Sequence, residues 1–222
     1  MSLRRILYSN SLVIAMFTIF LASIVGMSFA GWRSNNQANA EHAASVQTYT
    51  EYIVGGDFIE GVFENWESEF LQMWALVVLT VWLRQKGSSD SKPMRGRAPV
   101  DTLSRYSIIN STSWKKRFRA LGHTIYAHSL GASLFVLFLI SFSLHAVGGV
   151  AAFNEQNAQH NQSPMSARHY ITTSHFWYES LQNWQSEFLA IGTLLVLSIK
   201  LRERGSPESK PIGTRYDRHT GD

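Results

Sequence analysis

Two long stretches of this chain contain no charged residue, and they constrain the fold more than any other feature. Ser11 to Gly31 and Ser129 to Gly149 each run for about twenty residues, the length that an α-helix needs to cross a hydrocarbon core of roughly 30 Å. Two shorter apolar stretches, Phe70 to Leu83 and Phe188 to Ile199, are ambiguous, because stretches of roughly 10 to 14 residues are more often core or interfacial helices. The long stretches predict an integral membrane protein.

The chain also repeats itself at an offset of 118 positions, counted from Asn65 to Asn183. The pattern Asn-Trp-x-Ser-Glu-Phe-Leu begins at both positions, and each copy continues into a short apolar stretch that ends in Leu-Arg, at Arg84 and at Arg202. The two long stretches align under the same offset, so each half pairs one long stretch with one short one. The repeat therefore predicts that the short stretches cross the membrane as well.

We predict an all-α fold, namely a four-transmembrane-helix bundle of two tandem parallel two-helix repeats. Because each repeat crosses twice, the second copy enters from the same side as the first, and the pseudo-twofold axis runs along the membrane normal. The predicted helices lie near residues 11–31, 63–83, 129–149 and 181–201. The predicted domains are a first repeat at 1–93, a basic cytoplasmic linker at 94–118 with an interfacial helix starting near 113, a second repeat at 119–211 and a flexible cytoplasmic tail at 212–222.

The basic residues predict the orientation of these helices. Eighteen of the 20 lysines and arginines lie before the first long stretch, in the middle loop or in the C-terminal segment, whereas Arg33 and Arg168 stand alone in the two remaining loops. Cytoplasmic loops carry the excess of Lys and Arg, so both termini are predicted to be cytoplasmic. Arg4 and Arg5 before an apolar run also resemble a signal peptide, but the run is too long and recurs in mid-chain.

The repeated polar motif is the candidate functional site. Glu69 lies fifteen residues before Arg84, about 22 Å along a helix, which leaves it inside the outer edge of the hydrocarbon core. Two such carboxylates near the axis would share a proton or hold a cation. The alternative is capping of a helix start, with the tryptophans in an interfacial aromatic belt. The motif residues are Asn65, Ser68, Glu69, Asn183, Ser186 and Glu187, and the tryptophans are Trp66 and Trp184.

A basic amphipathic helix is predicted to start near Ser113. Apolar residues recur there at helical spacing while basic residues occupy the other faces, a pattern typical of a helix on the inner leaflet. The predicted contacts with anionic lipids are Lys115, Lys116, Arg117 and Arg119. A nucleic-acid patch is the alternative. We expect no nucleic-acid partner, because the basic residues that give the net charge of +4 lie beside the apolar stretches, where membrane proteins carry them.

The residue types exclude much chemistry. The chain has no cysteine, and it carries no phosphate-binding loop, dinucleotide fingerprint, zinc-protease helix or serine-nucleophile elbow. His128 and His145 lie roughly 26 Å apart on one helix and cannot ligate together. His42 and His160 coincide under the repeat, and His169 and His175 are nearby in the sequence. A surface metal site there stays open, although solvated loop histidines are the simpler interpretation. We predict no catalytic residue, no cofactor and no metal, and a protein that is not an enzyme.

The twice-repeated motif, from Asn65 to Arg84 and from Asn183 to Arg202, resembles an uncharacterised family of small bacterial integral membrane proteins of unknown function. The resemblance implies a multi-pass protein of the bacterial cytoplasmic membrane and imports no activity. Our favoured hypothesis is a structural or accessory component that associates with itself or with a larger membrane complex, its partners being the bilayer and anionic lipids. The alternative is a small proton or cation transporter or channel that uses Glu69 and Glu187.

Overall fold

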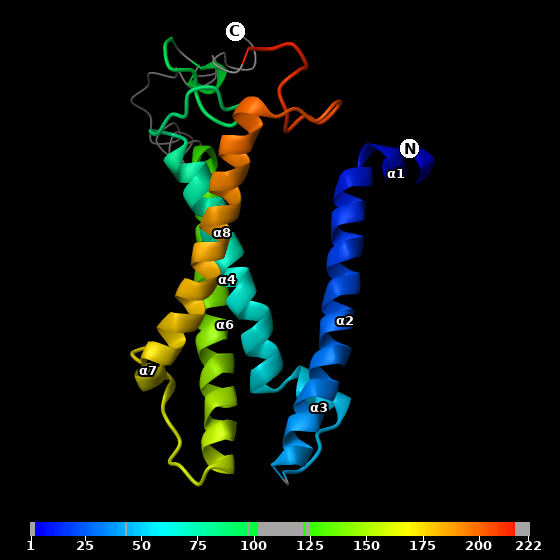
Figure 1. The fold of residues 1–222 in the computed structure, drawn as a ribbon, viewed down its shortest axis with the longest axis vertical. Coiled ribbons are helices and arrows are strands. Elements are labelled where there is room, and N and C mark those ends of the chain that lie inside the picture. The colour runs from blue at the N-terminus through cyan, green and yellow to red at the C-terminus, as the bar shows by residue number, and fades with distance from the viewer. Residues whose placement is uncertain (1–2, 43, 97, 102–121, 123–124, 216–222) are drawn as a thin grey trace. The chain divides into compact units, whose positions relative to one another are not determined.

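Every regular element of the described chain is a helix (Figure 1). The structure is a computed structural model, and it describes residues 3–42, 44–96, 98–101, 122 and 125–215. The all-α prediction is confirmed for this part of the chain, and α2 and α6 are long and apolar enough to cross a membrane. The elements are α1 (Leu3–Ser9), α2 (Ser11–Glu41), α3 (Tyr49–Ile53), α4 (Gly56–Leu79), η1 (Pro99–Asp101), α6 (Ser129–Gln159), α7 (Ala167–Tyr170) and α8 (Ser174–Lys200).

The helices differ in length from their predicted bounds. Both α2 and α6 have 31 residues and continue about ten residues past the predicted ends, near 31 and 149. The extensions contain no Gly or Pro that would end a helix, and they are rich in the good helix formers Ala and Gln. In turn, α4 and α8 begin seven residues before their predicted starts. Segments assigned to outer loops are thus largely helical.

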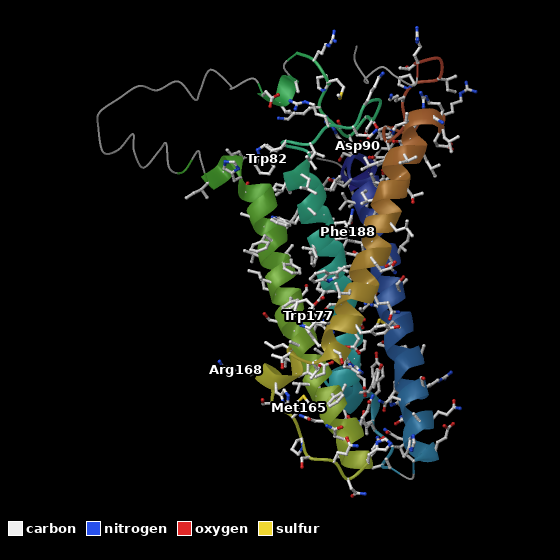
Figure 2. All side chains as sticks on the ribbon, turned by 60° about the vertical axis from the view of Figure 1, so that its left-hand side comes forward. Trp82, Asp90, Met165, Arg168, Trp177 and Phe188 are labelled. Atoms are coloured by element: carbon white, nitrogen blue, oxygen red, sulfur yellow. The ribbon has the colours of Figure 1, made fainter. Side chains whose placement is uncertain are left out.

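Asparagine side chains fix the chain where it turns back after α2 and α6. Asn36 accepts a bond from the backbone N–H of Gln47 (2.7 Å) and donates one to the carbonyl of Gln47 (2.9 Å). Asn154 makes the same two bonds to Met165, at 2.6 and 2.8 Å, in the segment before α7 (Figure 2). Each amide therefore satisfies the donor and the acceptor of one residue that no helix pairs.

The chain forms two compact units. The first consists of Met1–Phe63 and Leu144–Phe176, and the second of Glu64–Ser143 and Trp177–Asp222. Each unit draws on both halves of the sequence, because α4, α6 and α8 contribute one part to each. The predicted domains follow the sequence repeat, not these units, and stay a prediction.

Within the first unit, glycines let the start of α4 approach the end of α6 closely. A methyl group on Gly148 would lie 2.5 Å from the backbone nitrogen of Glu60, and one on Gly56 would collide with the backbone of Ala152. Real side-chain carbons do not approach backbone atoms so closely. The absence of a side chain at both positions thus permits backbone contact between the two helices, as small residues do in membrane helix pairs.

Within the second unit, aromatic side chains join α4, α6 and α8. The rings of Trp74 and Phe135 pack at a centroid distance of 5.1 Å between α4 and α6, and Phe138 meets Trp184 of α8 at 6.2 Å. Trp177 stands edge-on to Trp184 at 6.1 Å, and Figure 2 shows Trp177 near the start of α8. Such offset and edge-to-face pairs contribute about 0.5 to 1.5 kcal/mol each beyond their buried area.

We predict that Gly148→Ala destabilises the protein, because the added methyl group must push the α4 backbone away from α6. Overpacking of this kind costs about 1 to 3 kcal/mol. Thermal unfolding in detergent, followed by circular dichroism, measures the loss. Gly192→Ala in α8 is the matched control, since nothing lies within 4 Å of its added methyl group. Equal unfolding temperatures for the two variants would contradict the close α4–α6 contact.

Candidate functional site: a stripe of carboxylates on α4

Four carboxylates lie along one face of α4. Asp57, Glu60, Glu64 and Glu67 follow each other at spacings of three, four and three residues, and residues three or four apart share a helix face. We call these four residues the acidic stripe. At a rise of 1.5 Å per residue they extend over about 15 Å, which carries them from the first turn of α4 into its middle.

The first two carboxylates of the stripe bind donors within the first unit. Asp57 accepts a hydrogen bond from Nδ2 of Asn35 on α2 at 2.6 Å, and Glu60 accepts one from the hydroxyl of Tyr170 on α7 at 3.1 Å. A methyl group on Gly149 would lie 2.6 Å from both oxygens of the Glu60–Tyr170 bond. The glycine therefore leaves the space in which this bond forms.

A buried histidine stands beside Glu60 in the same unit. His145 is fully buried and stacks on Phe176 at a centroid distance of 4.8 Å. One of its ring nitrogens lies within 4.8 Å of a carboxylate oxygen of Glu60. A carboxylate, a phenol and an imidazole thus gather at one point of the stripe, and all three can take up or release protons.

The last two carboxylates bind donors on α8 within the second unit. Glu64 accepts a hydrogen bond from Nδ2 of Asn183 at 2.5 Å, and Glu67 accepts one from the indole N–H of Trp184 at 2.9 Å. Glu67 has no exposed surface. Asn35, Tyr170, Asn183 and Trp184 are all neutral donors, so they stabilise the carboxylates without neutralising their charge.

Only some of the predicted motif residues belong to this network; of the others, Ser68 is buried and Asn65 and Glu69 are at the surface. Asn183 and Trp184 belong to the network, and Trp66 is half-buried against Phe70. Glu69 and the half-buried Glu187 lie close enough for their charges to interact. The two serines bond to carbonyls of their own helices, Ser68 to Asn65 and Ser186 to Asn183, both at 2.8 Å.

The acidic stripe was not predicted from the sequence, because the predicted site consists of residues that the two halves share. The positions 118 residues after the stripe hold His175, Tyr178, Gln182 and Gln185, so a search for matching residues passes over all four acids. The signal that could have found them is their three-four-three spacing, which places four acids on one helix face. The residues that differ between the halves are therefore the informative ones.

Asp57 also lines a cavity of about 280 Å³ in the first unit, together with Glu155 of α6. Burial raises the pKa of the Asp57 carboxyl, and the bond from Asn35 opposes this effect. Burial also raises the pKa of Glu155, and the charge of Asp57 raises it further, while a bond from Gln47 lowers it. The two acids thus create a region of negative potential that favours a cation.

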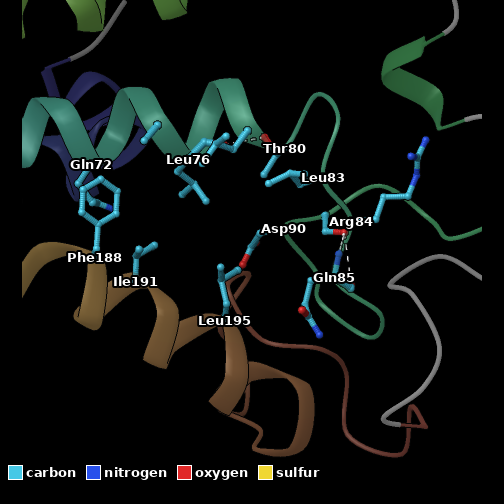
Figure 3. Close-up of a pocket in the computed structure, with 13 residues that line it drawn as sticks. Gln72, Leu76, Thr80, Leu83, Arg84, Gln85, Asp90, Phe188, Ile191 and Leu195 are labelled. Atoms are coloured by element: carbon cyan, nitrogen blue, oxygen red, sulfur yellow. Dashed lines mark hydrogen bonds between the residues drawn. The ribbon is translucent and has the colours of Figure 1, made fainter. Parts of the chain in front are cut away.

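A second cavity, also of about 280 Å³, lies between α4 and α8 in the second unit (Figure 3). Its walls are largely apolar, with Leu76 on α4 and Phe188 and Leu195 on α8. Arg84 and Asp90 stand at one end, where Arg84 donates to the carbonyl of Pro93 at 3.2 Å. Apolar walls with a polar end suit an extended apolar chain better than an ion.

The predicted anionic-lipid contacts, Lys115, Lys116, Arg117 and Arg119, lie outside the described residues.

Residues 3–222 match the model of the family named Domain of unknown function (DUF6766), and the chain belongs to this family. The predicted membership of an uncharacterised family is thereby confirmed. Neither a curated protein nor a solved structure matches the chain.

We predict that Glu155→Gln stabilises the folded protein at about pH 7. A folded-state pKa above the ordinary value means that the charged form costs stability, and this cost grows as pH rises from the ordinary pKa through the raised one. Gln keeps an acceptor for Gln47 and removes the charge, so the unfolding temperature should rise, although only slightly because solvent screens a partly exposed carboxylate. The gain should vanish below about pH 4, where both states of the wild type are protonated. Thermal unfolding across pH measures it, with the exposed Glu208→Gln as control; a gain that persists in acid would contradict the assignment.

Proposed function

We propose that the chain is a non-enzymatic, four-span membrane protein that handles protons or small cations along the acidic stripe of α4. The observation that carries the proposal is the set of carboxylates bound by neutral donors inside helical units, above all the fully buried Glu67 with its bond from Trp184. Acidic side chains are costly inside a membrane and mark ion pathways and proton relays there.

Several observations support the four-span architecture. α4 and α8 have 24 and 27 residues, so at 1.5 Å per residue they are about 36 and 40 Å long, enough to cross a bilayer. Asn36 and Asn154, whose side-chain amides each bind the backbone of one residue in the following turn, are 118 residues apart, as are the starts of α2 and α6. These recurrences favour two tandem copies, and the basic residues favour cytoplasmic termini in a cytoplasmic membrane.

Helix capping does not account for the stripe. A helix dipole stabilises acids within the first turn only, and that reach includes Asp57 but not Glu64 or Glu67. A buried carboxylate also contributes little net stability, because its desolvation offsets much of the gain from its interactions. The position of these acids is therefore better explained by a function that needs their charge.

The chemistry of the stripe defines what it can carry. Glu64 and Glu67 are three residues apart, about 4.5 Å along the helix axis at a rise of about 1.5 Å per residue, so their carboxylates share one face of the helix. Carboxylate oxygens bind protons and hard cations and repel anions. Tyr170 and the nearby His145 can exchange protons with Glu60. We therefore assign Glu60, Glu64 and Glu67 as the carriers.

The second candidate function is a structural or accessory component that associates with itself or with a larger complex. The observation that favours it is the exposure of α2, because only 6 % of its most apolar stretch is buried within the protein. An exposed apolar face of this kind fits lipid or a partner helix. The two functions differ in one measurable property, because only the first requires flux.

We predict that purified protein in liposomes carries protons down an imposed gradient, measured with an internal pH-sensitive dye. Glu67→Gln and Glu64→Gln should each lower the flux at least tenfold, because a neutral amide still accepts the bonds from Trp184 and Asn183 but cannot hold a proton in exchange. Glu208→Gln, an exposed position in the C-terminal segment, is the matched control.

Sodium and potassium gradients, followed with ion-selective dyes, separate proton from cation transport. Thermal unfolding of each variant establishes that it is folded. If both stripe variants are folded and retain full flux, the acidic stripe is not the carrier. If the wild type moves no proton or cation faster than empty liposomes, the accessory function replaces this proposal.

A further inference from the structure

The cavity of the first unit holds a pair of histidines in addition to its two acids. His42 follows the end of α2 and His160 the end of α6, and both line the cavity of about 280 Å³ with Asp57, Glu155, Asn39 and Gln159. Both histidines are exposed, so they stand where a solute can reach them, while Asn39 is 96 % buried. The proposed carriers Glu60, Glu64 and Glu67 do not line this cavity.

The two imidazole rings have the separation that one bound metal ion requires. Their centroids lie 6.1 Å apart with an angle of 58° between the ring planes. An ion about 2.0 to 2.1 Å from each coordinating nitrogen lies roughly 3 Å from each ring centre, so two rings that share it have centroids about 5 to 6.5 Å apart. The observed distance lies within this range.

The hydrogen bond of His160 leaves its other nitrogen available as a ligand. Nδ1 of His160 lies 2.9 Å from the carbonyl oxygen of Gln156. A carbonyl can only accept, so Nδ1 carries the proton and Nε2 of the neutral ring has a free lone pair. A backbone carbonyl bound to the second ring nitrogen is also the usual outer partner of a metal-ligating histidine.

The surroundings of the pair favour a cation. Asp57 and Glu155 accept amide bonds from Asn35 and Gln47 through one oxygen each, which leaves a second oxygen on each carboxylate with accepting capacity. The nitrogen of the Gln159 amide is used in a bond to Asn39, so its oxygen can face an ion. Imidazole ligands select zinc, copper and nickel over magnesium and calcium.

We propose that this cavity binds one divalent transition-metal ion through Nε2 of His160 and the imidazole of His42. Water molecules complete the coordination, and the carboxylates of Asp57 and Glu155 supply negative potential without being required as ligands. The site shares Asp57 with the acidic stripe, but its ligands lie on the segments that follow α2 and α6 and not among the proposed carriers Glu60, Glu64 and Glu67. Metal binding and proton flux are accordingly separate measurements.

The test is calorimetric titration of chelator-treated full-length protein in detergent with Zn²⁺ and Ni²⁺. The wild type should bind about one ion per chain with an affinity in the micromolar range, and His42→Ala or His160→Ala should weaken binding at least tenfold. Both histidines are exposed, so neither substitution should prevent folding. Glu155→Gln should weaken binding only a few-fold, because it alters the potential and removes no ligand.

His128→Ala, in the second unit, is the matched control and should bind as the wild type does. Binding that survives the double variant His42→Ala/His160→Ala would overturn the proposal, as would a wild type that binds no ion at millimolar metal. The proposal would also be overturned if the His169→Ala/His175→Ala variant lost binding while the His42→Ala/His160→Ala variant kept it. That result would place the metal site at His169 and His175. Equal affinity for Ca²⁺ and Zn²⁺ would show that the carboxylates, not the imidazoles, hold the ion.

Discussion

The backbone contact between α4 and α6 is the constraint on which the first unit depends. Gly148 admits the backbone of Glu60 to a distance that no side chain would tolerate, and its neighbour Gly149 leaves room for the bond between Glu60 and Tyr170. Two adjacent glycines therefore serve different purposes, one for helix packing and one for a hydrogen bond. The same approach of helices brings Asp57 and Glu155 to one cavity, where their charges act on each other.

Several backbone features recur 118 positions apart along the chain, whereas the acids of the stripe do not. Helix starts, backbone-binding asparagines and turns recur at the same offset; for example, Gly87 and Gly205 have φ values of 84° and 85°. In contrast, the acids at 64 and 67 correspond to Gln182 and Gln185. The residues that fix these turns recur with them, Asn36 as Asn154 and Gly87 as Gly205, whereas a buried carboxylate needs a hydrogen-bond donor opposite it. A repeat can therefore preserve a fold while its polar residues diverge.

Much of the fold could be predicted from the sequence because its signals are local. Uncharged stretches identify α2 and α6, and the repeat identifies helices around the motifs at Asn65 and Asn183. The extensions to Glu41 and Gln159 escaped prediction because Asn-rich segments resemble loops, and the local sequence does not show the bonds of Asn36 and Asn154 to distant backbone. The donors of the acidic stripe could not be predicted either. Tyr170 meets Glu60 across 110 residues of chain, a contact that no local pattern encodes.

The unequal halves have a consequence for how such a protein can be assembled. Two identical single copies related by symmetry would each bring a Glu64 and a Glu67 into the second unit, so the count of buried acids would double. A single chain with different halves lets one half supply the acids and the other supply Asn183 and Trp184 as their donors. A single chain with unlike halves is thus free of the symmetry that a homodimer imposes, and its buried polar residues can differ from one half to the other.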